Sequence, residues 1–228
     1  MRLLALTYGT EGDTRPLVML CHGLRQAGHE VMLLAEQGTL QTARDLGVPH
    51  AALEGDIHDD VVALVARGNH LAAASRGLAR MARRHVPAWM AQADAAAAGC
   101  DAALTGGLAA LVGLSVAERH GLPAVGTGMI PLTPTRAFAS PFLPPVPLPG
   151  VLRRASYGLV NQAVWRTLRG PINAARRTGA TAAPPAVDWP ADAVRHLPAA
   201  AAAASGLAGR PCGVRAMADA GAAMVAAC

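Results

Sequence analysis

The sequence predicts an α/β fold, a Rossmann-like doubly wound parallel sheet, on two observations. Short apolar runs of strand length alternate with longer segments in which apolar residues recur at helical spacing. Turn-forming segments separate them, such as TYGTEGDTRP after the first apolar run and HGLP before a later one. This alternation is typical of parallel strands in one sheet with helices packed on its faces.

The first unit of this pattern is the clearest. Residues 3–7 predict a strand, residues 16–27 a helix, and residues 30–35 a second strand. The helix has its apolar residues at helical spacing, and they are Leu17, Leu20, Cys21 and Leu24. Gly28 follows in the position that commonly ends a helix.

The same alternation continues through residue 127. The predicted elements are a short helix at 39–46, a strand at 49–53, one or two long helices within 56–98, a strand at 101–105, a helix at 108–119 and a strand at 123–126. We therefore assign residues 1–127 to one Rossmann-like domain, which is a normal domain size.

A proline-rich segment and a helix follow as a second region, residues 128–177. Seven of the 17 prolines of the chain lie between residues 131 and 150, which predicts a long extended loop. This loop is either a linker or, through Phe138 and Phe142, an apolar wall for a substrate. Residues 151–177 predict an amphipathic helix with one apolar side, made by Leu152, Leu159, Val160, Ala163, Val164 and Leu168.

The last region, residues 178–228, has no sustained periodicity. It contains 20 alanines, six of them consecutive, and almost no large side chain to bury. We expect this tail to be poorly structured, and its composition resembles GC-rich DNA translated out of frame.

Composition narrows the function classes. The net charge of +5 comes from 20 arginines without any lysine, spread along the chain, and few aromatic residues accompany them, so we expect no nucleic-acid partner. The four cysteines and eight histidines show no ligand spacing, which predicts no metal site and a reduced, cytoplasmic protein. The longest apolar stretch, residues 102–117, is too short and too glycine-rich to span a membrane.

The turn after the first strand holds the main candidate site, because open parallel sheets bind ligands at the carboxyl ends of their strands. Gly9 and Gly12 lie in this turn, where free backbone amides could receive an anion. Asp13 has two interpretations that are not exclusive. Asp13 or Thr14 caps the following helix ahead of Pro16, or the Asp13 carboxylate acts as a general base.

A nucleotide-dependent oxidoreductase is a further alternative. The turn carries GxxG where the dinucleotide fingerprint has GxGxxG, and Glu36 stands near the end of the second strand, where a ribose partner is expected. The match is partial, so an NAD(P)-binding domain is the weaker interpretation.

Several separated motifs resemble one family. GTEGDTRPLVMLCHGLRQAGHEV is similar to the opening GTRGDVQPxxALxxxLxxxGHxV of glycosyltransferases of the sterol glucosyltransferase and antibiotic glycosyltransferase type. GLPAVGTGMIPLTPTRAFASPFLPP, followed by GLVNQAVWRTLRGPIN, resembles the stretch that leads out of the N-terminal domain of the same family. The resemblance covers residues 1–177. Glu11, Thr14 and Arg15 depart from the family pattern.

The resemblance implies one half of a GT-B fold, the half that binds the acceptor. Gly9, Thr10, Gly12 and Asp13 would then form the acceptor loop, with Asp13 as the base for the attacking hydroxyl. Thr133 and Arg136 match the family's linker motif, without an assigned chemical role. The implied reaction transfers a hexose from a nucleotide sugar, UDP- or dTDP-linked, to a hydroxyl of a lipid-, sterol- or polyketide-like acceptor.

The donor-binding half of that family is not found in this sequence, because no segment resembles its HHGGAGT-like motif. We therefore expect no bound cofactor and no turnover by this chain alone, as in a truncated or frameshifted product or a dedicated acceptor subunit. A non-catalytic binding partner of a glycosyltransferase is the alternative. The exposed face where a second domain would dock would also favour association.

Overall fold

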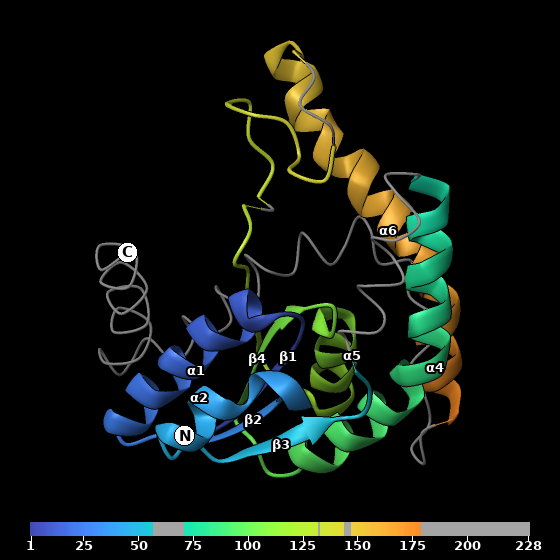
Figure 1. Ribbon diagram of the computed structural model, residues 1–228. Coiled ribbons are helices and arrows are strands. Elements are labelled where there is room, and N and C mark those ends of the chain that lie inside the picture. The colour runs from blue at the N-terminus through green and yellow to red at the C-terminus, as the bar shows by residue number, and fades with distance from the viewer. Residues whose placement is uncertain (57–70, 132, 144–146, 179–228) are drawn as a thin grey trace.

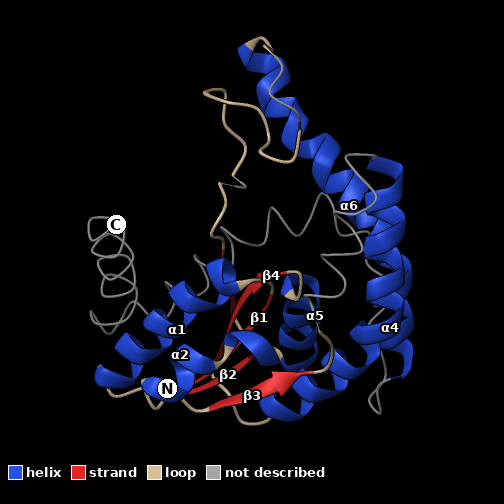
Figure 2. Cartoon of the chain, viewed as in Figure 1, coloured by secondary structure: helices blue, strands red, loops and turns tan. Residues whose placement is uncertain are grey.

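The computed structural model describes residues 1–56, 71–131, 133–143 and 147–178. Five parallel strands form one sheet in the order β3-β2-β1-β4-β5 (Figure 1), and Figure 2 shows them enclosed by helices. The strands are β1 (Arg2–Tyr8), β2 (Glu30–Glu36), β3 (His50–Leu53), β4 (Ala102–Gly107) and β5 (Ala124–Thr127). This arrangement confirms the predicted Rossmann-like parallel sheet.

β1 is the central strand because it is apolar along its length and has a strand on each side. Its residue Leu3 pairs with Val31 of β2 and with Ala102 of β4. Residues 3–8 of β1 are all buried, so both faces of the sheet are covered at this position. A continuous apolar run of this kind is the signature of a strand buried on both faces.

One face of the sheet is covered by α1 (Glu11–Gln26), the short 3-10 helix η1 (Gln37–Thr39) and α2 (Gln41–Asp45). The core beneath them includes Leu3, Ala5, Leu17, Val18, Cys21, Leu24, Val31, Leu33 and Leu104. Three of the four residues that predicted the first helix are fully buried here, and Leu20 is half-buried against them.

The other face is covered by α4 (Leu71–Ala97), α5 (Ala110–His120) and the carboxyl-terminal half of α6 (Gly150–Thr178). Their core includes Leu4, Leu6, Tyr8, Trp89, Val112, Val116, Leu168 and Ile172. Trp89 is fully buried, its indole nitrogen donates to the Glu54 carbonyl over 2.6 Å, and its ring lies 4.2 Å from that of Tyr8. This contact ties α4 to the carboxyl ends of β1 and β3.

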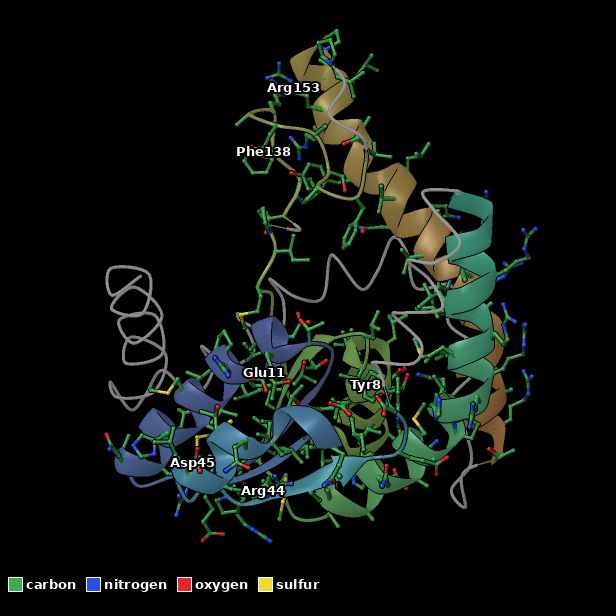
Figure 3. The ribbon with its side chains drawn as sticks, viewed as in Figure 1. Tyr8, Glu11, Arg44, Asp45, Phe138 and Arg153 are labelled. Atoms are coloured by element: carbon green, nitrogen blue, oxygen red, sulfur yellow. The ribbon has the colours of Figure 1, made fainter. Side chains whose placement is uncertain are left out.

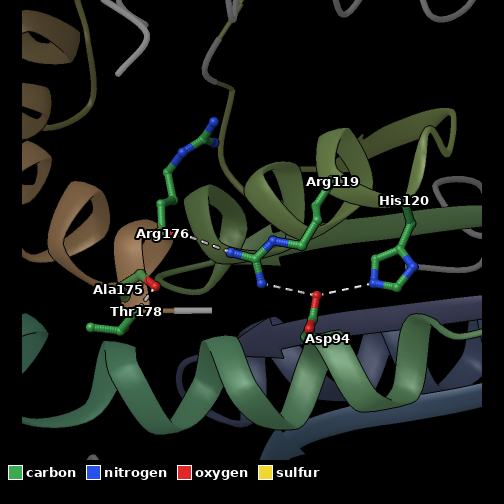
Figure 4. Close-up of polar contacts among 6 residues, drawn as sticks. All are labelled: Asp94, Arg119, His120, Ala175, Arg176 and Thr178. Carbon is green, nitrogen blue, oxygen red and sulfur yellow. Dashed lines mark hydrogen bonds and ion pairs between the residues drawn. The ribbon is translucent and has the colours of Figure 1, made fainter. Parts of the chain in front are cut away.

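A polar network fixes the end of α6 against α4 and α5. Arg176, with 4% of its side chain exposed, donates to the Glu118 carboxylate over 2.9 Å. Arg119 reaches the Arg176 carbonyl and the Asp94 carboxylate, and Asp94 also contacts His120 over 3.0 Å (Figure 4). The network joins three helices and holds the carboxyl-terminal half of α6 on the sheet.

The amino-terminal half of α6 extends away from the sheet, and here the predicted apolar side is partly wrong. Val160 and Leu168 are buried, whereas Leu152, Leu159, Ala163 and Val164 are exposed. The buried side is set by Tyr157 and Trp165 together with the contact to α4, which covers only the lower half of the helix (Figure 1). Periodicity found a helix but not the side that tertiary contacts cover.

The described residues between β5 and α6 contain no helix or strand, as the prolines predict. The division into 1–127 and 128–177 stays a prediction. The predicted tail, residues 178–228, lies outside the described residues except for Thr178. Among the described helices, none combines the length and the hydropathy needed to cross a bilayer.

Candidate functional site

From β1 the strand order runs outward through β2 to β3, and β4 then lies on the other side of β1. The carboxyl ends of β1 and β4 are therefore the expected ligand site of the sheet. β1 continues into α1 on one face, and β4 continues into α5 on the other. Adjacent strands whose connections leave on opposite faces form a topological switch point, where open α/β sheets bind ligands. The β1–α1 turn lies directly at this point.

The turn is shorter than predicted because α1 begins at Glu11 and not at Pro16. Thr10 is the N-cap, so the prediction that Asp13 or Thr14 is the cap is wrong in position. Asp13 is the third residue of the helix and completes a capping box, in which its Oδ2 accepts the Thr10 backbone N–H over 3.1 Å. The reciprocal bonds stabilise a helix start five residues ahead of the proline.

Gly9 fits the capping box because its missing side chain leaves room for the Asp13 carboxylate. A Cβ built on Gly9 would overlap that carboxylate, with Asp13 Cγ at 2.7 Å and Cβ at 3.0 Å. The turn therefore presents Asp13 at a fixed place beside the end of β1. Gly12, by contrast, is exposed, and its Cβ would meet only Thr10 Oγ1 at 3.5 Å.

The three departures from the resembled family pattern each find a partner in the structure. Glu11 and Arg15, on successive turns of α1, form an ion pair with each other. Thr14 is fully buried, and its hydroxyl lies 2.9 Å from that of Thr39 in η1. The Glu11 charge is thus paired along the helix, while the Thr14–Thr39 contact joins α1 to the segment after β2.

The charges in the first turn of α1 disfavour an anionic ligand there. Glu11 and Asp13 are both acidic, and the Asp13 carboxylate already accepts the Thr10 N–H. A dinucleotide pyrophosphate needs free amides and the positive end of the helix dipole at this position. The turn therefore lacks the electrostatics of an NAD(P) site.

Two glycines at the end of β4, which are not among the candidate residues predicted from the sequence, complete this edge of the sheet. A Cβ on Gly106 would lie 2.5 Å from the Thr127 carbonyl oxygen. Gly107 has a positive φ of 57°, and its Cβ would lie 2.5 Å from the Tyr8 carbonyl oxygen. Only glycine allows this close approach of β4 to β1 and β5. In the sequence, the pair GG directly after an apolar strand could have indicated these two positions.

The linker-motif residues lie apart from this turn. The segment that carries Thr133 and Arg136 rises away from the sheet toward the amino-terminal half of α6 (Figure 1). Thr133 is exposed, and Arg136 lines a shallow pocket with Val151 and Arg154. The structure therefore brings Gly9, Thr10, Gly12 and Asp13 together and places Thr133 and Arg136 elsewhere.

The cysteines of the described region do not form a reactive centre. Burial raises the pKa of the Cys21 thiol to about 12, and burial also raises the pKa of Cys100, opposed by the nearby charge of Arg2. Neither is a thiolate at neutral pH, and the thiolate is the reactive form. Within the described ranges, no group of three His, Cys, Asp or Glu side chains could hold a metal ion.

Comparison with known proteins shows that the chain is similar to glycosyltransferases. No protein-family model matches the chain. Glycosyltransferase GtfE of Amycolatopsis orientalis is 33% identical over 195 residues, which are 82% of this chain and 46% of that protein. A sterol 3-beta-glucosyltransferase of Glomerella lagenarium is 25% identical over 76% of this chain and 12% of its own length. The chain thus spans less than half the length of these relatives.

The comparison with solved structures also finds a glycosyltransferase. The glycosyltransferase SnogD from Streptomyces nogalater superposes with a TM-score of 0.51 at 18% identity, over 78% of this chain and 42% of that one. Likeness at this identity concerns the fold, a Rossmann-like half of the GT-B architecture. In sequence and in fold, the chain is therefore related to GT-B glycosyltransferases of the sterol glucosyltransferase and antibiotic glycosyltransferase type.

Proposed function

We propose that this chain is the acceptor-binding half of a glycosyltransferase, in which Asp13 is the general base. The observation that carries the proposal is the capping box, which holds the Asp13 carboxylate beside Gly9 at the carboxyl end of the central strand. One oxygen, Oδ2, takes the Thr10 N–H, and among the described residues Oδ1 has no hydrogen-bond partner. Oδ1 is therefore free to accept a proton from an acceptor.

The proposed reaction is the transfer of a hexose to a hydroxyl. Asp13 Oδ1 takes the hydroxyl proton as the acceptor oxygen bonds to the anomeric carbon, and the bond from that carbon to the nucleotide diphosphate breaks. The leaving group is already activated, so the chain's task at this site is to orient the acceptor and remove one proton. Gly9, Thr10 and Gly12 serve as the loop that positions Asp13.

The acceptor class and the donor follow from the relatives and remain part of the proposal. The matched proteins include a sterol 3-beta-glucosyltransferase, which supports a hydroxyl of a lipid-, sterol- or polyketide-like molecule. The donor is a UDP- or dTDP-sugar, bound by residues other than those described here, and the reaction is cytoplasmic. Because this sequence corresponds to 46% of GtfE, we propose that the chain alone does not turn over.

The proposal is tested with a fusion protein that adds a donor-binding half to this chain. This chain is fused to the part of GtfE that has no counterpart in it, and sugar transfer is measured with a panel of sterol and polyketide alcohols. Asp13→Asn should lower kcat by about 10²- to 10⁴-fold, the range for loss of a general base, while acceptor binding is retained. Asp45→Asn is the matched control, since Asp45 is an exposed carboxylate on α2 that bonds Gln41.

Each outcome has a separate meaning. Transfer that is unchanged in Asp13→Asn would contradict the role of Asp13 but not the acceptor function. A folded fusion that binds none of the alcohols would contradict the acceptor function, and transfer by the unfused chain would contradict its incompleteness. A thermal shift with NAD or NADP would favour the oxidoreductase alternative.

A further inference from the structure

The proline-rich segment and the start of α6 form an arm that carries an exposed apolar surface. We define the arm as residues 133–143 and 147–164, which lie at the end of the molecule away from the sheet (Figure 1). In Figure 3, Phe138 and Arg153 lie on this arm, far from Glu11 and Tyr8. The most exposed apolar side chains are Phe138 at 45%, Phe142 at 53%, Val151 at 69%, Leu152 at 52% and Leu159 at 66%.

The backbone that carries the two phenylalanines is held to α6 by hydrogen bonds. The Ser140 amide, midway between Phe138 and Phe142, donates to the Ser156 hydroxyl of α6 over 2.8 Å. Arg153 donates to the carbonyl of Ala137 over 2.9 Å and to that of Leu148 over 2.6 Å. The loop is therefore tied to the helix on both sides of its phenylalanines, which point outward from a fixed position.

On α6 the exposed apolar residues form one stripe. Leu152, Ala155, Leu159 and Ala163 follow each other at intervals of three or four residues, which places them on a single side of the helix. All four are exposed. The stripe runs beside a pocket of about 400 Å³ with mostly apolar walls, lined by Pro134, Arg136, Val151, Arg154, Ala155 and Gly158.

The charge around this surface has one sign. No Asp or Glu occurs between Glu118 and Asp188, whereas residues 128–178 contain seven arginines. The exposed ones are Arg136, Arg154, Arg166, Arg169 and Arg177. In the part of the chain that the structure describes, none of these five is in an ion pair.

Apolar anchors among unpaired arginines suit an apolar surface that carries negative charge. A second copy of the arm would bring arginines against arginines, so like charges oppose self-association. A bilayer surface offers an apolar layer for the phenylalanines and the helix stripe, and phosphates for the guanidinium groups. We propose that the arm docks on the surface of a membrane that contains anionic phospholipids.

In this geometry Phe138 and Phe142 enter the interface, and the pocket between Arg136 and Arg154 takes a lipid phosphate with the start of its acyl chains. Anionic lipid is required because its negative charge attracts the arginines over a long range. Each arginine near the surface should raise the partition coefficient about fivefold. The proposal does not depend on the glycosyl transfer proposed above, since binding to lipid is measured without donor or acceptor.

The test is co-sedimentation of the purified chain with vesicles of phosphatidylcholine, with and without phosphatidylglycerol, at low and high salt. We expect binding to the anionic vesicles and its loss at high salt. Arg136→Gln with Arg154→Gln should lower the partition coefficient by about fivefold per residue. Phe138→Ser with Phe142→Ser should lower it at least about tenfold, since two apolar anchors are removed.

Matched controls lie on α1 and α2, outside the arm. Arg44→Gln removes an exposed arginine on α2, and Met19→Ser removes a side chain of α1 that is 48% exposed. Neither should alter binding. Equal binding to neutral and anionic vesicles, or equal losses in the control variants, would overturn the proposal. So would a chain that forms a dimer through Phe138 and Phe142 and does not bind anionic vesicles.

Discussion

Gly9→Ala tests whether the Asp13 carboxylate is held by the capping box and by the space above Gly9. The added methyl would overlap the carboxylate, with Asp13 Cγ at 2.7 Å, so the side chain must leave its place. Loss of the cap interaction costs about 1 kcal/mol, and a forced rotamer costs about 0.5 to 1.5 kcal/mol. Alanine also lowers the conformational entropy of the unfolded chain, which stabilises the folded state by about 0.4 to 1 kcal/mol.

The net expectation is a loss of about 1 kcal/mol in the free energy of unfolding. In the Asp13→Ala background the overlapping atoms are gone, except for Cβ at 3.0 Å, and Gly9→Ala should be within about 0.5 kcal/mol of neutral. Urea unfolding of all four proteins, followed by far-UV circular dichroism, gives the coupling energy. An equal cost of Gly9→Ala in both backgrounds would refute the packing argument.

Three further predictions concern stability and are measured by urea unfolding. Arg176→Met should destabilise by about 1 to 3 kcal/mol, because it leaves Glu118 without its buried partner, and Glu118→Gln should cost less. The pKa of Cys21 is raised to about 12, against 9.0 for a free thiol, so the thiol ionises at lower pH in the unfolded state than in the folded state. The free energy of unfolding should therefore fall between pH 9 and 12, by up to about 4 kcal/mol. Cys21→Ala should remove this part of the fall. Gly170→Ala, in open space inside α6, should stabilise by up to about 1 kcal/mol, whereas Gly113→Ala, whose Cβ would lie 2.8 Å from a side chain of β4, should destabilise.

The outcomes of these predictions are distinct. A Cys21→Ala protein with the same alkaline loss as the parent would show that another group titrates. An Arg176→Met variant as stable as the parent would show that α6 is held by its apolar contacts alone. A destabilised Gly170→Ala variant would mean that the exposed side of α6 is not open.

The start of α1 illustrates a limit of sequence signals. Pro16 is a strong helix-start residue, and it moved the predicted start five residues too late. The reciprocal bonds between Thr10 and Asp13 depend on backbone geometry at the end of β1, where the close packing of Gly9 also acts. The structure makes Thr10 the N-cap and Asp13 the third residue of the helix, whereas the sequence predicted Asp13 or Thr14 as the cap.

The apolar side of α6 illustrates the opposite case. Helical periodicity predicts Leu152, Leu159 and Val164 on one apolar side with Val160 and Leu168. Burial depends on which neighbour is present, and α4 covers only the carboxyl-terminal half of the helix. The exposed stripe of the arm is therefore a feature that periodicity cannot distinguish from a core.

The sequence by itself determined the parallel sheet, the order of its strands along the chain and the turn that carries Asp13, because these follow from local periodicity and turn chemistry. Only the tertiary structure decided that Thr14 meets Thr39 and that Gly107 approaches the end of β1. It also separated the arm from the sheet. These features arise from contacts between segments distant in sequence, and such contacts form only when the chain has folded.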